Sequence, residues 1–161
     1  MILTALAVIL LASATPIIHN FNVAVLPANA YFRQVTIEVD PVPTETTAGW
    51  LGIQAARQGD LVQVGWLNAS GNLSAFYQVW QDGVIIATST VGPVLHYGDN
   101  LTIAMSTNGR GQWLTWVKSG SKWSVVWMGE ETLTLKTGIW VIATETVGPG
   151  RVPRLNYRID L

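Results

Sequence analysis

Short apolar runs separated by turn signals fill the sequence beyond residue 33. The run 35–39 (VTIEV) alternates apolar and polar residues, as a half-buried strand does. Further strand-like runs cover 49–54, 60–67, 74–81, 84–89, 101–106, 112–118, 123–128, 131–135, 139–144 and 154–159. The pairs Asp82-Gly83 and Asn108-Gly109 favour tight hairpin turns. Because strands recur with no helical period between them, the sequence predicts a mainly β protein, an antiparallel β-sandwich or jelly roll over 33–161.

The first 32 residues form a segment without Asp, Glu, Lys or Arg. A helix over 1–18 would be about 27 Å long, close to the thickness of a bilayer's hydrocarbon core. Three interpretations compete: a cleaved secretory signal peptide with 12–14 as its small-residue cleavage site, a membrane anchor, and the N-terminal helix of a filament subunit. No basic residues precede or flank the run, which disfavours the first two. We therefore expect a hydrophobic N-terminal α-helix and linker over 1–32 before the sandwich.

This uncharged start is similar to that of archaeal type IV pilins, although Ala5 stands where many bacterial pilins carry a glutamate. The resemblance implies a structural subunit of an extracellular, cell-surface filament, with further copies of the chain as its partners and the membrane only before assembly. The helices would bundle in the filament core and the sandwich would form the sheath. The core side chains would be Ile2, Leu3, Leu6, Ile9, Leu10 and Ile17.

The middle of the chain resembles a second family. The segments 49–53 (GWLGI), 61–65 (LVQVG), 75–80 (AFYQVW) and 97–103 (YGDNLTI) follow the order and spacing of glutamic peptidases, over roughly 48–146. That resemblance implies a concanavalin-like double-sheet sandwich and a catalytic Gln–Glu pair. Gln63 falls at the family's glutamine, but Ile139 stands at its glutamate, and Glu145 is six residues further on. Because isoleucine cannot transfer a proton, we expect no peptidase activity and no enzyme.

The composition excludes most other functions. Nine basic and ten acidic residues nearly cancel, so no patch is basic enough for nucleic acid. The chain has no cysteine, and His19 and His96 are far apart, so we expect no metal site. Neither a nucleophile elbow nor a phosphate-binding loop occurs, and we expect no cofactor.

Eight tryptophans lie on the strand-like runs. They could form a stacking platform for sugars, or they could pack the core and subunit contacts. Trp113 and Trp116 have opposite strand parity and must point to opposite faces, which argues against one platform and favours packing.

Three glycosylation sequons begin at Asn68, Asn72 and Asn100, all at expected turns, so N-linked glycans are expected partners. The alternative to a filament subunit is a secreted monomeric sandwich with a cleaved signal peptide. Such a protein would bind carbohydrate or be an inactive relative of the glutamic peptidases.

Overall fold

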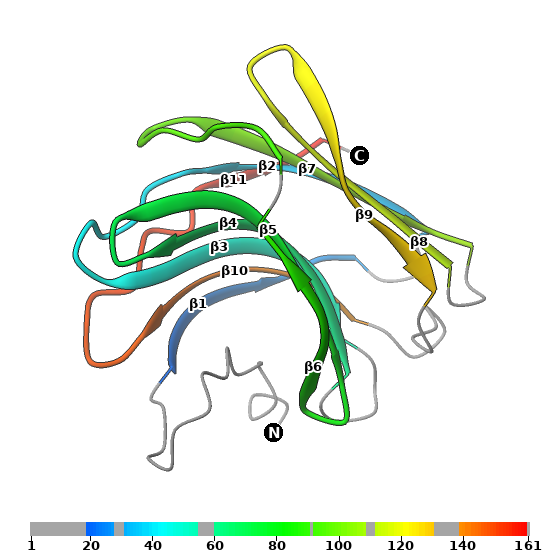
Figure 1. The fold of residues 1–161 in the computed structure, drawn as a ribbon, viewed down its shortest axis with the longest axis horizontal. Helices are drawn as coiled ribbons and strands as arrows, with labels where there is room; N and C mark the ends of the chain where they lie inside the picture. The colour runs from blue at the N-terminus through cyan, green and yellow to red at the C-terminus, as the bar shows by residue number, and fades with distance from the viewer. Residues whose placement is uncertain are drawn as a thin grey trace.

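Two antiparallel sheets pack face to face in the computed structural model, which describes residues 19–27, 31–54, 60–90, 92–108, 112–130 and 139–160 (Figure 1). The six-stranded sheet has the order β1 (His19–Val25), β10 (Ile139–Val147), β3 (Thr46–Gln54), β4 (Leu61–Ala69), β5 (Asn72–Gln81) and β6 (Val84–Ser89). The five-stranded sheet has the order β11 (Tyr157–Ile159), β2 (Phe32–Glu38), β7 (Asn100–Thr107), β8 (Gln112–Ser119) and β9 (Lys122–Glu130). The predicted β-sandwich is confirmed.

The main hydrophobic core lies between the two sheets. Alternate residues of the central strands supply it, including Leu51 and Ile53 from β3 and Ile103 and Met105 from β7. Trp66 of β4 is fully buried in this layer, and its indole N–H donates a hydrogen bond of 3.2 Å to the Glu38 carbonyl of the opposite sheet. The sheets are therefore joined by a polar contact as well as by apolar packing.

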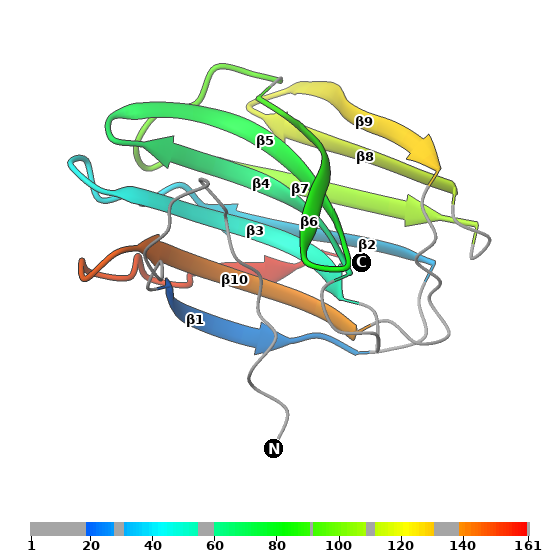
Figure 2. The same ribbon diagram turned by 60° about the horizontal axis from the view of Figure 1, so that its bottom comes forward.

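The six-stranded sheet is bent, and its concave face is directed away from the five-stranded sheet (Figures 1 and 2). We use the term concave face for this surface throughout. A second apolar cluster lies on it, formed by Ala48, Trp50, Leu61, Phe76, Trp80, Val141 and Ala143. The central strands β3, β4 and β10 are therefore buried on both faces, which explains their continuous apolar sequences.

Two hairpins follow the turn chemistry of the sequence. Asp82 and Gly83 both adopt positive φ, 53° and 78°, so the predicted turn between β5 and β6 is confirmed. The loop expected over 68–72 is shorter than predicted. Only Ser70 and Gly71 make the turn, with φ of 52° and 101°, while Asn68 belongs to β4 and Asn72 to β5.

The N-terminal expectation is corrected in part. The described residues contain no helix, and among them no helix could cross a membrane. Residues 19–25, expected as linker, form strand β1, which pairs with β10 from His19 opposite Val147 to Val25 opposite Val141. The alternation of His19, Phe21 and Val23 with Asn20 and Asn22 suits an edge strand with one apolar face. The sandwich therefore begins before residue 33. The expected helix over 1–18, with its six filament-core residues, and the expected strand over 131–135 lie outside the described residues.

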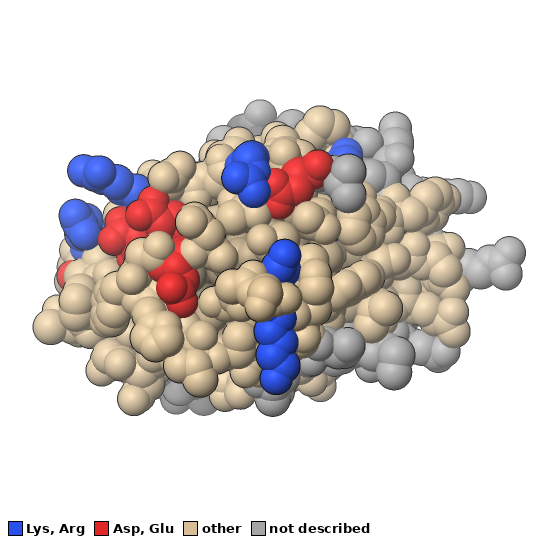
Figure 3. Space-filling model, turned by 90° about the horizontal axis from the view of Figure 1, so that it is seen from above, with Lys and Arg blue, Asp and Glu red and all other residues tan. Residues whose placement is uncertain are grey.

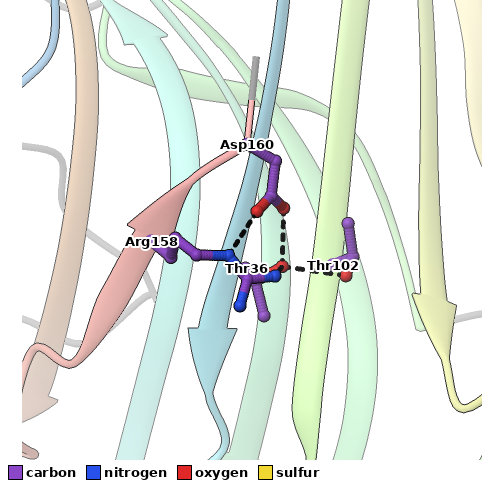
Figure 4. Close-up of polar contacts among 4 residues, drawn as sticks. All are labelled: Thr36, Thr102, Arg158 and Asp160. Atoms are coloured by element: carbon purple, nitrogen blue, oxygen red, sulfur yellow. Dashed lines mark hydrogen bonds and ion pairs between the residues drawn. The ribbon is translucent and has the colours of Figure 1, made fainter.

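A polar cluster fixes the short strand β11 against β2 at the edge of the five-stranded sheet (Figure 4). The Thr36 hydroxyl donates to an Asp160 carboxylate oxygen at 2.7 Å and lies 3.0 Å from the Thr102 hydroxyl. The Arg158 guanidinium donates to the other Asp160 oxygen at 2.6 Å. Burial alone would raise the pKa of Asp160, but these hydrogen bonds and the Arg158 charge lower it overall.

Charged side chains are sparse on the face of the molecule that is seen from above (Figure 3). Seen from above, the Lys, Arg, Asp and Glu side chains form a few small groups separated by wide uncharged areas (Figure 3). This view matches the low charged content of the whole chain, 12%. It shows no extended basic area of the kind that binds nucleic acid.

Candidate functional site

A pair of buried glutamines occupies the centre of the concave face. The Gln63 amide N–H of β4 donates a hydrogen bond of 2.7 Å to the Gln78 side-chain oxygen of β5. Gln63 is 1% exposed and Gln78 is 6% exposed. Gly52 lies opposite Gln63 on β3, and Val141 lies opposite Gly52 on β10, so the four residues form one row across the sheet. A Cβ at Gly52 would lie 2.9 Å from the Val62 carbonyl oxygen and 3.0 Å from the Trp50 ring, so neighbouring atoms fill the space beside Gln63.

Several polar atoms on this face are buried without a hydrogen-bond partner among the residues that the structure describes. They are the Trp50 and Trp80 indole N–H groups, the Gln63 side-chain oxygen and both Glu145 carboxyl oxygens. Most buried polar atoms in folded proteins have a partner, and an exception calls for an explanation. Trp113 of the inter-sheet core is one such exception elsewhere, but the concave face gathers most of them. Unused donors and acceptors on one aromatic-lined face are typical of a ligand-binding surface.

The structure places the three residues of the glutamic-peptidase comparison on the same face but does not bring them together. Ile139 and Glu145 share strand parity with Val141 on β10, and Gln63 lies in the Val141 row. Glu145 is four residues beyond Val141, about 13 Å along the strand. No carboxylate therefore stands beside Gln63 on β10, where Ile139 and Val141 present only methyl groups. Ile139 and Glu145 lie six residues apart on the one strand β10, as expected from the sequence.

Glu145 lies at one end of the concave face, opposite Phe21 of β1 and Ala48 of β3. It is 1% exposed, and burial raises the pKa of Glu145 to about 8, with Trp50 offsetting part of the rise. The Trp50 indole N–H and the carboxyl make no hydrogen bond of acceptable geometry, and burial is the larger of the two effects. Desolvation dominates, and the carboxyl is neutral in the folded protein at pH 7.

His19 completes this corner. Its ring stacks on Phe21 with centroids 6.0 Å apart and an interplanar angle of 13°. Both ring nitrogens are buried without a partner, and burial lowers the pKa of His19. Two titratable side chains thus stand in an aromatic environment that disfavours charge on either of them.

Metal-ligating side chains are not grouped in the part of the chain that the structure describes. No group of three or more His, Asp or Glu side chains is placed to hold a metal ion there. His96 lies on a loop, where its Nδ1 is 3.4 Å from an Asp99 oxygen, far in sequence from His19.

The tryptophans are divided between layers. Trp66, Trp113 and Trp140 pack in the inter-sheet core. Trp50 and Trp80 lie on the concave face. Trp116 contacts Phe32 edge-on, with centroids 6.1 Å apart. The expectation that Trp113 and Trp116 cannot share one platform agrees with this placement, yet two other tryptophans do share a face.

The sequon asparagines differ in exposure. Asn68 is fully buried, and its side-chain N–H₂ donates to the carbonyls of Val42 at 3.0 Å and Glu45 at 2.8 Å. The expectation of an exposed Asn68 at a turn is therefore wrong, because this side chain fixes the neighbouring loop. Asn72 and Asn100 are exposed, and their glycosylation stays a prediction.

Sequence reasoning missed the partners of Gln63 and Glu145 on this face. Gln78, Trp50 and Phe21 were assigned to strands or linker without a common surface. The alternation of side chains along each strand predicts part of this face. Residues 48, 50 and 52 of β3 and residues 61, 63 and 65 of β4 alternate with the positions that face the core. The order of the strands in the sheet was needed to combine them.

Comparison with known proteins supports the fold. No known family profile matches the chain, and no curated protein sequence does. Among solved structures, a scytalido-glutamic peptidase bound to a transition-state analogue inhibitor is similar, with a TM-score of 0.60 and 14% identity over 86% of this chain and 77% of that one. A functionally unknown protein from Saccharomyces cerevisiae has a TM-score of 0.56 and 12% identity, over 90% and 74% of the two chains. Sheep galectin-11 has a TM-score of 0.50 and 10% identity, over 86% and 98%.

At these identities the likeness shows the architecture alone. The chain has the β-sandwich of the glutamic peptidases, shared also by lectin-like proteins, as the sequence resemblance implied. Nothing in the comparisons or in the described residues supports a type IV pilin or a filament.

Proposed function

We propose that this protein binds an extended peptide on its concave face and does not cleave it. The observation that carries the proposal is the Gln63–Gln78 pair. The Gln63 side-chain oxygen is buried at the centre of that face and has no hydrogen-bond partner among the described residues. The Trp50 and Trp80 indole N–H groups supply donors on the same surface. Amide oxygens and N–H donors complement the N–H and C=O groups that a peptide backbone presents at every residue.

The distance between Gln63 and the nearest β10 carboxylate supports binding without cleavage. A general base must lie within hydrogen-bond reach of the attacking water, directly or through one water molecule. The β10 positions nearest to Gln63 are Val141 and Ile139, which cannot take a proton. Glu145 is about 13 Å further along the strand, too far to share a water with Gln63. This separation supports a peptide-binding role without hydrolysis.

The structural neighbours are the reason for proposing a peptide as the ligand. A scytalido-glutamic peptidase structure with a TM-score of 0.53 is described with a peptide-based transition-state analogue. The same fold here keeps a glutamine at the centre of the concave face. We therefore favour peptide over other polar ligands.

The burial of the two tryptophans lowers the affinity that we expect for a ligand. Trp50 is 0% and Trp80 is 3% exposed, so a ligand must replace the contacts that now cover them. A binding-competent state that is rarely populated lowers the apparent affinity by its population. We therefore expect the peptide to associate slowly. We expect its dissociation constant to be micromolar or higher.

The indole N–H groups allow a direct test by NMR. With ¹⁵N-labelled tryptophan, a capped peptide such as acetyl-Ala-Val-Ala-Phe-Val-Ala-amide is titrated into the protein. Trp50→Phe and Trp80→Phe assign the two signals that we expect to move. Trp113→Phe is the matched control, since its indole N–H is also buried and unpartnered but lies in the inter-sheet core. Unchanged Trp50 and Trp80 signals at millimolar peptide would refute the proposal.

Cleavage is tested on the same peptide by chromatography and mass spectrometry after incubation between pH 3 and 7. We expect the intact peptide throughout. Cleavage by the wild type that is lost in Gln63→Ala would show that the protein is a peptidase.

Carbohydrate is the second candidate, favoured by the two tryptophan rings on one face. A lectin, sheep galectin-11, and a Bacteroides ovatus protein described with a xyloglucan locus, with a TM-score of 0.56, have similar sandwiches. Lactose and a xyloglucan oligosaccharide are therefore titrated in parallel. Movement of the Trp50 and Trp80 signals with sugar but not with peptide would assign the face to carbohydrate.

A further inference from the structure

The Glu145 corner of the concave face has the composition of a cation site. Its carboxyl has no hydrogen-bond partner, and Phe21 lies directly opposite on β1. His19 stacks on Phe21, and Trp50 follows Ala48, the β3 residue opposite Glu145. A buried carboxyl among three aromatic rings provides both a counter-charge and π-faces, which are the two features that attract an organic ammonium group.

We propose that Glu145, with His19, Phe21 and Trp50, binds the protonated amino terminus of the peptide that occupies the concave face. The inference rests on the proposed function. It adds the direction in which the peptide lies on the concave face and the length of peptide that the face binds. The Gln63 row and Glu145 are separated by two strand spacings and four residues, about 16 Å in all. An extended peptide covers that distance in about five residues.

Binding at this corner must release a proton. The carboxyl of Glu145 is neutral when it is buried without a partner, because desolvation disfavours its charged form. When an R–NH₃⁺ group arrives, the carboxylic acid gives its proton to the buffer, and the carboxylate pairs with the ammonium ion. No other bond changes. The free-amine peptide therefore gains affinity as pH rises, while the acetylated peptide does not.

His19 is the other titratable side chain that faces this corner among the described residues. The β3 positions on the same face, from Thr46 to Gln54, carry no ionisable group, and neither do the β10 positions from Ile139 to Ala143. Protonated His19 would repel an ammonium ion at low pH and act in the same direction as Glu145. A His19→Asn variant separates the two contributions.

The test compares a hexapeptide with a free amino terminus and its N-acetylated form by calorimetry at pH 5.5 and 6.5. For the wild type we expect the ratio of the two affinities to rise about tenfold per pH unit, with release of about one proton per free-amine peptide bound. In Glu145→Gln, the affinity ratio should no longer change with pH, and no proton should be released on binding. Both effects should persist in His19→Asn. Glu38→Gln is the matched control, a carboxyl on the other sheet that accepts a hydrogen bond from Asn156 at 2.7 Å.

Equal affinity for both peptides would overturn the amine site and leave peptide binding intact. If neither peptide binds, the proposed function fails, and n-butylammonium chloride then tests the corner alone. A lowered pKa of ¹³C-labelled Glu145 in its presence would support an amine site. An unchanged pKa would overturn it.

Discussion

The stability of this protein should depend on pH through Glu145 above all. Burial raises the pKa of this carboxyl from 4.5 to about 8 in the folded state. A folded-state pKa above the unfolded value means that the folded protein binds more protons than the unfolded chain between these two pH values. The stabilisation is therefore complete below pH 4.5 and is lost as pH rises toward 8.

The size of the loss follows from the shift. Each pKa unit corresponds to about 1.4 kcal/mol, so the rise of Glu145 costs the folded state about 4 to 5 kcal/mol between pH 4.5 and 8. Domains of this size are stable by only about 5 to 15 kcal/mol, so the effect is a large share of the total. Replacing Glu145 with glutamine keeps the shape of the neutral acid and removes the ionisation.

Urea unfolding at pH 5, 6, 7 and 8 measures the difference in the free energy of unfolding between the wild type and Glu145→Gln. We expect wild type and Glu145→Gln to be similar at pH 5, and the variant to be more stable by about 4 kcal/mol at pH 8. Burial lowers the pKa of His19, which costs stability as pH falls below 6.5, but that contribution is common to both proteins and cancels in the comparison. Glu38→Gln, on the other sheet, is the control substitution.

The reasoning would be refuted by a constant difference between the two proteins from pH 5 to pH 8. Such a result would mean that Glu145 ionises in the folded protein as easily as in the unfolded chain. The carboxyl would then have a polar partner or solvent contact, and the neutral state required by the amine site would not exist.

Four further outcomes are expected. Asn68→Ala should lower the free energy of unfolding by about 2 kcal/mol, because two hydrogen bonds to the 42–45 loop are lost, whereas Asn72→Ala at the exposed start of β5 should be neutral; thermal melting compares them. Gly65→Ala should cost about 3 kcal/mol or more by calorimetry, because its Cβ would meet the β3 backbone. Asp160→Asn should cost under about 1 kcal/mol at pH 7 and less at pH 3, since the stabilisation from a lowered folded-state pKa is complete above the usual value of 3.8 and is lost as pH falls through the folded-state pKa; urea unfolding at the two pH values tests this. The filament hypothesis predicts that Leu6→Asp abolishes filaments while the sandwich still folds, which negative-stain microscopy and circular dichroism decide.

The strands were largely predictable from the sequence because each carries local information. Alternation marked β2, and turn pairs such as Asp82-Gly83 marked the hairpins. The strand β1 was not predicted because its residues follow an apolar run, and hydrophobicity alone suggested continuation of a helix or linker. Pairing with β10, more than 100 residues away in the chain, fixes this segment as a strand.

The candidate site was predictable only at its separate positions. Gln63 was singled out through a family resemblance, and Ile139 was singled out as the residue that prevents catalysis. The contact between Gln63 and Gln78 depends on the register of the β4–β5 hairpin. The burial of Glu145 depends on β1 and β3 lying on either side of β10. Neither arrangement can be read from spacing, because sequence distance along one strand does not show which strands become neighbours.

The order of the strands also determines when the domain can form during synthesis. Strand β1 pairs with β10 and strand β2 pairs with β11, so segments from the two ends of the described chain lie side by side in both sheets. A nascent chain that has emerged to residue 130 holds β1 without a partner and β3 with one side open. Closing such distant pairs makes folding slow and exposes apolar strands meanwhile. We therefore expect the emerging chain to need a chaperone until residues 139–159 leave the ribosome.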